Sequence, residues 1–313
     1  MSNEIAMEHA LLGAPLEYLT PLERPSLEEA QAWCRNLATM HYENFHVETF
    51  FLPRKVRPHF ECIYAYCRVA DDMGDEVADP VVAARLLNTW GSMLEECYDT
   101  PELSIHPVFV VLQETIRDCD PPRQLFLDLL RAFQMNQVKT KYTSWDELLE
   151  YSHYSANPVG RLVLWVCGYR DESLGLLSDK VCTALQLANF WQDVVEDAER
   201  GRRYVPGETM ARFGVEEGQI EGRVFTPEFR AMIQDLVGYT SAMLLEGESI
   251  SSRVDKDLAV TLNLFCKGGE AILNGIAADN FDVLRGRHMV SKMRKLGLLM
   301  EALAGKLRAR MAA

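Results

Sequence analysis

The chain has 313 residues, 48% of them hydrophobic, which is too apolar for a disordered or collagen-like protein and enough for one large core. Its 46 Asp and Glu against 32 Lys and Arg give a formal net charge of −14. This balance argues against nucleic acid as a partner, because nucleic-acid binding needs basic surfaces. Scattered acidic side chains usually serve solubility alone, so only acid that gathers on one helix face indicates a site.

Cysteine usage and the termini bear on the compartment. The eight cysteines form no Cys-x-x-Cys pair, and most stand in apolar runs such as LVLWVCGY, so we expect buried free thiols in a reducing environment. The acidic N-terminus has no basic-then-apolar signal, and no apolar run of about 18 residues is present. We therefore expect a cytoplasmic protein. Contact with the inner face of a membrane stays open.

Helical period runs through almost the whole chain. In chain order it extends from a capping box at Ser26 towards Tyr42, over 60–77 and 82–97, after Pro121-Pro122, from a second capping box at Ser144 through Tyr151, over 178–200, from Thr226-Pro227, and over 255–278 and 290–310. Asn157-Pro158 should interrupt the helix that carries Tyr151. Gly201 should stand just past the end of the 178–200 helix.

No segment of useful length alternates between apolar and polar residues, and no hairpin signal joins two apolar runs. The sequence therefore predicts an all-α protein. We expect residues 26–313 to form a single helical bundle with a central cavity, and residues 1–25 to form a loosely ordered leader.

The first acidic motif is YAYCRVADDMGDE, residues 64–76. Asp71 and Asp75 are four residues apart and share one helix face with Arg68 and Tyr64. Like charges at this spacing destabilise a helix by about 0.2–0.5 kcal/mol per pair, and a bound cation would reverse that sign. Mg²⁺ is commonly held by one or two carboxylates together with phosphate oxygens of a substrate. The motif therefore favours a magnesium–phosphate site.

The second acidic motif is LQLANFWQDVVEDAERGRRY, residues 185–204. Asn189, Asp193 and Asp197 form a stripe with a spacing of four residues, between apolar neighbours that predict a largely buried helix. Carboxylates on such a helix are unfavourable unless they are paired or bind metal. Arg202 lies among the arginines that follow, where it can reach phosphate oxygens.

Several other sites are excluded by spacing. Neither acidic segment has the loop and glycine of an EF-hand, and no Glu-x-x-His pair supports a di-iron centre. HExxH, GxSxG and P-loop motifs are absent as well. A solvated acidic face would explain either motif alone, but it explains two such stripes beside aromatic residues and arginines poorly.

The two motifs, in this order and separation, resemble those of the squalene/phytoene synthase family of head-to-head isoprenoid synthases, and the similarity extends from about Trp33 to Lys306. The resemblance implies the all-α isoprenoid synthase fold. It also implies that two aspartate-rich helices face each other across a cavity and bind a prenyl diphosphate through two or three Mg²⁺ ions. A nicotinamide cofactor is not expected, because no Gly-rich nucleotide motif is present.

Carried over to this chain, the family's pattern assigns roles to individual residues. The metal ligands would be Asp71, Asp72, Asp75, Asn189, Asp193 and Asp197, with Asp72 binding weakly or standing behind the others. Residues in contact with substrate would be Asn44, Tyr64, Arg68, Gln186, Gln192, Arg202 and Tyr204. The residues that carry catalysis would be Asp71, Asp75, Tyr151, Asp193 and Asp197.

Within the family, the segments FFLPRKVRP, YSHYSANPVGRLVL and FWQD most resemble bacterial hydroxysqualene synthases. This implies ionisation of presqualene diphosphate and capture of the cation by water, on the route to hopanoids, with contacts to other triterpene-pathway enzymes left open. Gln192 and Gly269 depart from the arginine and the tyrosine of some relatives, which weakens the case for condensation of two farnesyl diphosphates. That squalene or dehydrosqualene/phytoene synthase reaction stays an alternative, as does a non-catalytic assembly factor.

Overall fold

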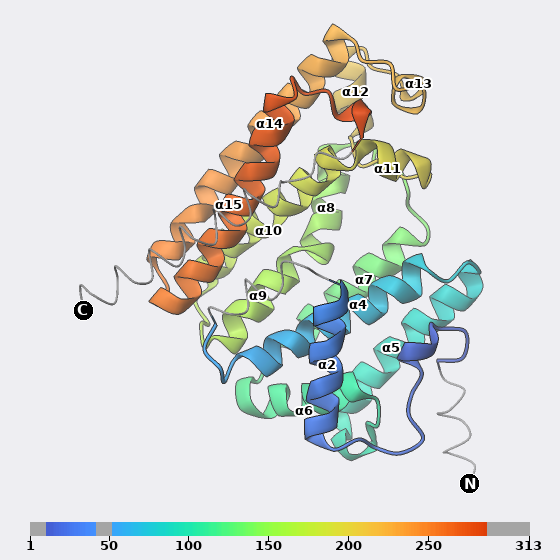
Figure 1. Ribbon diagram of the computed structural model, residues 1–313, viewed down its shortest axis with the longest axis vertical. Coiled ribbons are helices and arrows are strands. Elements are labelled where there is room, and N and C mark those ends of the chain that lie inside the picture. Colours follow the sequence, from blue (N-terminus) through green and yellow to red (C-terminus); the bar gives the residue numbers. More distant parts are fainter. Residues whose placement is uncertain (1–10, 42–51, 287–313) are drawn as a thin grey trace. The chain divides into compact units, whose positions relative to one another are not determined.

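The computed structural model of the protein describes residues 11–41 and 52–286, and those residues form helices joined by turns (Figure 1). Within this part of the chain β-pairing is limited to two isolated bridges, one of which joins Lys141 to Arg203. The all-α prediction is confirmed. Backbone contacts divide the chain into a first unit, Met1–Val138 with Pro158–Arg170, and a second unit, Lys139–Asn157 with Asp171–Ala313. Each is described by itself, and a single domain stays a prediction.

The first unit is organised around α4. Its elements are η1 (Leu16–Tyr18), α2 (Leu27–His41), α4 (Arg57–Asp75), α5 (Pro80–Asp99), η2 (Pro101–Leu103), α6 (Pro107–Cys119), α7 (Arg123–Asn136) and nearly all of α9 (Asn157–Val166). Helix α4 contacts α2, α5, α6 and α7. Its Tyr66 lies in the core, 5.1 Å from the Phe126 ring and 5.8 Å from the Trp90 ring between centroids. Only one edge of α4 stays accessible.

The second unit is organised around α10. Its elements are α8 (Trp145–Ser155), α10 (Glu172–Gln192), α11 (Val194–Glu199), α12 (Gly207–Phe213), α13 (Glu217–Glu221), α14 (Pro227–Glu248), η3 (Ser249–Ser252), α15 (Lys256–Ala278) and η4 (Val283–Arg285). Helices α10, α14 and α15 lie side by side and all contact one another (Figure 1). The buried Trp191 of α10 donates to Thr240 Oγ1 of α14 at 2.8 Å.

Local signals in the sequence set several helix ends. Ser26 and Glu29 form the predicted capping box, with Ser26 N donating to Glu29 Oε2 at 2.9 Å and Glu29 N donating to Ser26 Oγ at 3.3 Å. Thr226 caps α14 through its hydroxyl, and Pro227 occupies the first turn. Gly201 follows α11 with a φ of +73°, the left-handed conformation expected for a residue just past a helix end.

The structure departs from the sequence prediction in several places. Helix α6 was not predicted, because its first turns, PVFVVL, are apolar throughout and rich in β-branched residues, and the short helices α12 and α13 were not predicted either. The helix predicted over 178–200 begins at Glu172 and is interrupted at Asp193. Within the segment expected to be a loose leader, Leu11 and Tyr18 are fully buried. The helix predicted over 290–310 lies outside the described residues.

The structure also bears on the cysteines and on the hydropathy of the helices. All eight cysteines are free thiols, and Cys34, Cys62, Cys97 and Cys266 are buried. Across residues 11–41 and 52–286, each helix is either too short or too polar to cross a lipid bilayer.

The contact between α10 and α14 gives a paired test of packing. A Cβ on Gly247 would lie 2.7 Å from Val181 Cγ2 and 2.9 Å from Val181 N, whereas a Cβ on the exposed Gly238 of the same helix would meet nothing within 4 Å. We expect Gly247→Ala to lower the free energy of unfolding by about 1–3 kcal/mol. Gly238→Ala should raise it by up to about 1 kcal/mol. Urea denaturation checks both, and equal effects would contradict the packing.

Candidate functional site

The first acidic motif lies on the accessible edge of α4. Tyr64 and Arg68 are half-buried, the Asp71 side chain is 43% exposed, and Asp75 is exposed. The residues between them belong to the core of the first unit. The four side chains therefore share an accessible edge of α4, as their spacing predicts, and their role in a site stays a prediction. Residue Asn44, predicted to contact substrate, lies outside the described residues.

Asp72 is placed differently from the other carboxylates of the motif. It is only 2% exposed. Its Oδ2 accepts from Tyr18 Oη and, at 2.9 Å, from Arg68 Nε, and its Oδ1 pairs with Arg68 Nη2. Both carboxylate oxygens are thus engaged by protein donors in the core. In this arrangement Asp72 holds Arg68, and its role as a metal ligand stays a prediction.

Arg68 keeps one nitrogen directed at the accessible edge of α4. The guanidinium binds Asp72 through Nε and Nη2, and Nη1 lies 3.7 Å from Asp71 Oδ2. Glu76 Oε1 lies 3.7 Å from Nη2. Such a side-on ion pair fixes the plane of the guanidinium. The third guanidinium nitrogen, Nη1, is therefore directed toward Asp71 on the accessible edge of α4.

The charges of this group follow from burial and pairing. Burial alone would lower the pKa of Arg68, but the negative charges on Asp72 and Asp71 raise it. Burial, followed by the hydrogen bond to Asp72, raises the pKa of Tyr18 above its ordinary value. Arg68 therefore stays a cation and Tyr18 stays a hydrogen-bond donor throughout the physiological pH range.

The second acidic motif spans the junction between α10 and α11. Asn189 is exposed, while Asp193 and Asp197 are half-buried. The backbone of Asp193 has φ −103° and ψ 20°, in the bridge region where many active-site residues are found. The bonds Asp193 N to Asn189 O and Asp197 N to Asp193 O persist at 2.9 and 2.8 Å. The interruption is a local bend, and it leaves the three side chains in one row.

The electrostatics of Asp197 fit a cation site. Burial and the negative charge of Asp193 raise the pKa of Asp197 to about 7, against an ordinary value of 3.8. A partly buried pair of carboxylates is unfavourable when both are ionised. A cation would remove that repulsion, and the oxygen donors of Asn189, Asp193 and Asp197 are the type that Mg²⁺ prefers.

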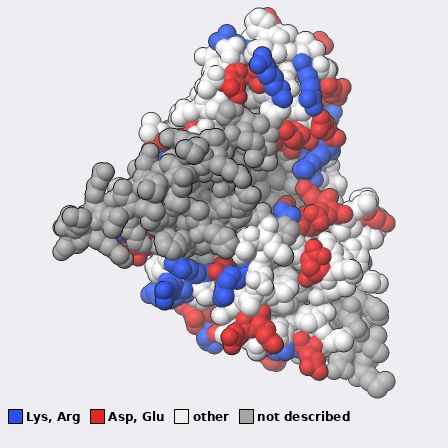
Figure 2. Space-filling view, viewed as in Figure 1, with Lys and Arg blue, Asp and Glu red and all other residues white. Residues whose placement is uncertain are grey.

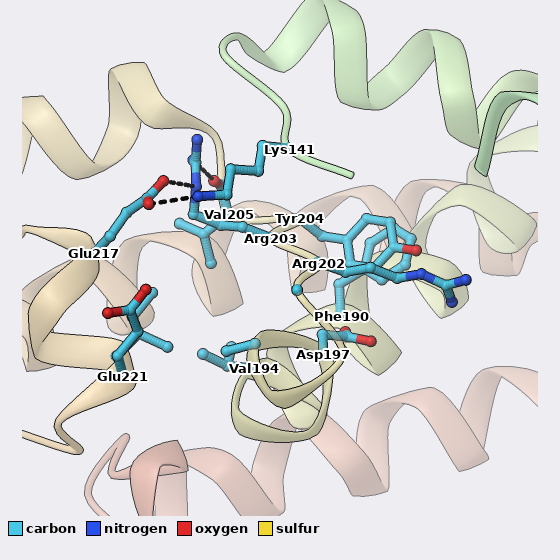
Figure 3. Close-up of a pocket in the computed structure, with 13 residues that line it drawn as sticks. Lys141, Phe190, Val194, Asp197, Arg202, Arg203, Tyr204, Val205, Glu217 and Glu221 are labelled. Carbon is cyan, nitrogen blue, oxygen red and sulfur yellow. Dashed lines mark hydrogen bonds and ion pairs between the residues drawn. The ribbon is translucent and has the colours of Figure 1, made fainter. Parts of the chain in front are cut away.

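The end of α11 brings Arg202 close to this row. Gly201 N donates to Ala198 O at 2.9 Å, and Arg202 N donates to Asp197 O at 2.8 Å. This Schellman turn depends on the left-handed backbone of Gly201. Arg202 is thus tied through its backbone to the residue that ends the acidic row. In Figure 3 the Arg202 side chain and the Asp197 carboxylate lie toward Tyr204 and Phe190, away from Glu217.

Arg203 bonds to residues that hold the segment after α11 in place. Its Nε pairs with Glu217 Oε1 at 2.8 Å, and its Nη1 donates to the carbonyl of Val205 at 2.5 Å (Figure 3). The same Nη1 also donates to the carbonyl of Tyr142 at 3.2 Å. Lys141 Nζ takes the other oxygen of Glu217 at 2.7 Å. Together with the backbone bridge between Lys141 and Arg203, this network fixes the segment that carries Arg202 and Tyr204.

Four aromatic rings pack beside the second acidic row. Tyr204 stacks on Phe190 with centroids 3.8 Å apart and an interplanar angle of 6°. Tyr151 lies 5.9 Å from Tyr204 and 6.2 Å from Phe190. Tyr142 lies 5.5 Å from both Tyr151 and Tyr204. The predicted residues Tyr151 and Tyr204 are therefore brought together, and burial raises the pKa of Tyr204 and of Tyr142.

A pocket of about 70 Å³ lies next to Asp197, lined among others by Val194, Arg202 and Glu221. Ligand sites for molecules of drug size usually measure about 300–1,000 Å³, so this pocket is too small for a whole prenyl chain. Among the residues that the structure describes, no group of three or more His, Cys, Asp or Glu is arranged to hold a metal ion. One or two carboxylates with phosphate oxygens are enough for Mg²⁺.

The remaining predicted residues lie along α10 and α15. Gln186 is half-buried, and Gln192, the last residue of α10, is 4% exposed. A Cβ on the buried Gly269 would lie 2.6 Å from Leu185 Cδ2 and 3.2 Å from Leu244 Cδ2. A tyrosine at this position would collide with both leucines, so the departure at Gly269 follows from packing.

Two residues that contact these groups escaped sequence reasoning. Tyr18 stands 54 positions before its partner Asp72, in a segment without helical period. Tyr142 stands just before the capping box at Ser144, and its contact with Tyr204 depends on the bridge between Lys141 and Arg203. No signal in the sequence marks Tyr18. For Tyr142, the sequence offers only its nearness along the chain to the predicted site residue Tyr151.

The surface charge follows the simple expectation. On the face drawn in Figure 2, acidic and basic side chains are interspersed over the described surface. Exposed ion pairs such as Arg212–Asp235 and Arg223–Glu199 belong to this pattern. On this face the acidic side chains form no single patch.

Comparison with known proteins places the chain among isoprenoid synthases. The sequence model of the squalene/phytoene synthase family matches residues 38–294. Hydroxysqualene synthase of Zymomonas mobilis is 32% identical over 274 residues, which cover 85% of this chain and 88% of the relative. The 15-cis-phytoene synthase of a Paracoccus species is 29% identical over 274 residues, covering 82% and 85%.

A solved structure agrees with these relatives. The crystal structure of squalene synthase HpnC from Alicyclobacillus acidocaldarius matches with a TM-score of 0.77 and 39% identity, over 87% of this chain and 98% of that one. A dehydrosqualene synthase in complex with ligand matches with a TM-score of 0.81 at 22% identity, over 90% and 98%. The second likeness concerns the fold alone.

Removing the charge of Asp197 should stabilise the metal-free protein. Because the pKa of Asp197 is raised to about 7, the folded state binds its proton more tightly than the unfolded state, and stability falls as pH rises from about 4 to about 7. We expect Asp197→Asn to raise the free energy of unfolding at pH 8 by up to about 4 kcal/mol and to change it little near pH 4. Urea denaturation in EDTA measures this.

The matched control is Glu221→Gln, which removes an exposed carboxylate from the same pocket. Its effect on stability should be small at both pH values. Equal stability of Asp197→Asn and the unchanged protein at pH 8 would contradict the picture of a destabilised charge.

Proposed function

We propose that this chain, which belongs to the squalene/phytoene synthase family, ionises presqualene diphosphate with Mg²⁺ and lets water capture the cation, giving hydroxysqualene and diphosphate. The observation that carries the proposal is a row of carboxylates four residues apart in each unit, on the accessible edge of α4 in the first and across the junction of α10 and α11 in the second, with an arginine close in sequence to each row. The similarity to a hydroxysqualene synthase at 32% identity supports the same reaction.

Five side chains are proposed to hold Mg²⁺. Asp71 and Asp75 would do so on α4, and Asn189, Asp193 and Asp197 on α10 and α11. The raised pKa of Asp197 supports this set, since it reflects a carboxylate placed where a positive charge is needed. Bound Mg²⁺ supplies electrophilic stabilisation of the departing diphosphate. Asp72 is left out of the set, because both of its oxygens are already engaged.

Arg68 and Arg202 are proposed to bind the diphosphate. When the bond between the substrate carbon and the diphosphate oxygen breaks, the electron pair leaves with the oxygen, and negative charge grows on the leaving group. Fixed cationic donors aimed at that charge lower the barrier more than mobile ones, because they need no reorganisation during the reaction. Two hydrogen bonds support this role: Arg68 Nε donates to Asp72 Oδ2, and the backbone N of Arg202 donates to Asp197 O.

The carbocation left behind needs surroundings that stabilise it without reacting. Aromatic faces stabilise a passing cation by about 0.5–2 kcal/mol each, and Tyr151, Phe190 and Tyr204 are proposed to do so. Water then forms a C–O bond to the cation and loses a proton, so no hydride is transferred and NADPH is not consumed. Gln192, beside Asp193 at the end of α10, is proposed to help place that water.

The second candidate is the condensation of two prenyl diphosphates, as the names of a squalene synthase and of phytoene synthases among the relatives suggest. It uses the same acidic rows and the same leaving group. Formation of squalene would in addition require a hydride donor. Substrate and product therefore distinguish the two reactions better than any residue of the site.

The direct test of this function is product analysis. We expect presqualene diphosphate with Mg²⁺ and without NADPH to give hydroxysqualene, identified by mass spectrometry, and expect ¹⁸O from labelled water in the alcohol. Farnesyl diphosphate alone should give no C30 product. Turnover of farnesyl diphosphate to a C30 hydrocarbon, in parallel reactions with and without NADPH, would establish the second candidate, and no turnover of presqualene diphosphate would contradict the first.

The acidic rows are tested by substitution. Asp71→Asn and Asp193→Asn should each lower kcat by about 100-fold or more, because each removes a carboxylate proposed to hold the Mg²⁺ that stabilises the leaving group. The helical circular-dichroism spectrum should stay unchanged. Asp146→Asn, which alters an exposed carboxylate in the first turn of α8, is the control and should retain activity. Full activity in either row variant would refute the assignment.

Gln192 is tested through the product distribution. If its amide helps to place water, Gln192→Leu should lower the proportion of alcohol among the products and raise that of hydrocarbons. The rate of diphosphate release should fall less than the yield of alcohol. Gln192→Arg should shift the distribution in the same direction. An unchanged distribution in both variants would remove Gln192 from the site. Gas chromatography of the extracted products makes the measurement.

A further inference from the structure

Tyr18 joins the N-terminal segment to the middle of the first acidic motif. It is fully buried, and it lies in η1, in front of the region that the family model matches. Its hydroxyl donates to Asp72 Oδ2, the same oxygen that accepts from Arg68 Nε. The N-terminal segment is therefore connected to the guanidinium of Arg68 through one shared carboxylate.

The Tyr18 ring is held by a continuous set of aromatic contacts within the first unit. It meets Trp33 of α2 edge-on, with centroids 6.4 Å apart at 71°. Trp33 lies 5.4 Å from His106, and His106 lies 4.9 Å from Trp90. Trp90 in turn stacks on Tyr66, two residues before Arg68 on α4. Such packing fixes the ring, so the hydroxyl reaches Asp72 from a defined direction.

We propose that Tyr18 is a positioning residue for diphosphate binding: it orients the Asp72 carboxylate, which in turn holds Arg68 with Nη1 directed toward Asp71. This inference rests on the proposed function, because it assumes that Arg68 binds a diphosphate. Tyr18 itself touches no substrate in this scheme. It acts only through Asp72 and Arg68.

The physical reason is the freedom that an arginine otherwise has. An unrestrained arginine side chain occupies many rotamers, and ordering it on binding is unfavourable. Asp72 removes this freedom by accepting two bonds from one edge of the guanidinium, provided that the carboxylate does not rotate. A third donor from a rigid ring blocks that rotation. Supporting residues of this kind keep a binding group in its productive geometry before the ligand arrives.

The competing explanation is that Tyr18 only fills the core. Tyr18→Phe separates the two, because it keeps the ring and its contacts and removes only the hydroxyl. Tyr98→Phe is a matched control in the same unit. It removes a tyrosine hydroxyl that donates to Pro121 O at 2.8 Å and that has no part in the Arg68 group.

The experiment is a double-mutant cycle read by calorimetry with inorganic diphosphate in the presence of Mg²⁺. Tyr18→Phe should weaken diphosphate binding about tenfold, as loss of a supporting hydrogen bond commonly does. In the Arg68→Ala background the same change should have an effect of less than about twofold, because the group that it positions is gone. Tyr98→Phe should bind diphosphate like the unchanged protein.

Kinetics provide a second readout on the same variants. The kcat/KM for presqualene diphosphate should fall about tenfold in Tyr18→Phe, and Asp72→Asn, which keeps the shape but removes one acceptor oxygen, should lose more. Unchanged diphosphate affinity in Tyr18→Phe would overturn the inference. So would an equal loss with and without Arg68. An unchanged protein that binds no diphosphate and turns over no prenyl diphosphate would instead contradict the proposed function.

Discussion

Repulsion between carboxylates on accessible helix faces is the constraint on which this site depends. Acids four residues apart lie on the accessible edge of α4 and across the junction of α10 and α11. In the second row, burial and then the negative charge of Asp193 raise the pKa of Asp197 to about 7, so its ionised form is unfavourable without a cation. The protein tolerates the unfavourable charge because the surrounding helices bury a large apolar core. Functional sites often lower the stability of a protein in this way, and the rest of the fold compensates for the loss.

The arginines complement the acids by different means. Arg68 is held by its side chain, through the buried Asp72 and Tyr18. Arg202 is placed by its backbone, through the Schellman turn at Gly201, while the neighbouring Arg203 is committed to Glu217. Of these two adjacent arginines, Arg203 thus fixes the segment, and Arg202 lies next to the end of the acidic row at Asp197. In both cases a fixed framework orients a cationic group before any ligand is bound.

Much of this fold and site was predictable because its signals are local. The capping box at Ser26, the proline after Thr226 and the glycine at position 201 act within one or two helical turns, and the structure contains each of them. The spacing of Asp71 and Asp75 determined their common face in the same way. Helix α6 was missed because its β-branched run is helical through burial rather than propensity.

The remaining features depend on contacts between distant segments. Nothing near Tyr18 in the sequence indicates that it reaches Asp72, and nothing near Asp72 indicates that its carboxylate is buried and bonded to Tyr18 and Arg68. The bend at Asp193 likewise interrupts a segment whose periodicity is continuous. The sequence thus identified the acidic rows, and the structure shows that Asp72, unlike Asp71 and Asp75, is buried and bonded to Arg68.

The central claim is that the acidic rows bind Mg²⁺ together with diphosphate, and titration of Mg²⁺ into the protein with and without inorganic diphosphate tests it most directly. The account predicts weak binding of Mg²⁺ alone, strong binding when diphosphate is present, and loss of the strong binding when Asp71 and Asp193 are both changed to asparagine. Equal Mg²⁺ binding with and without diphosphate, or strong binding that survives the double substitution, would contradict it.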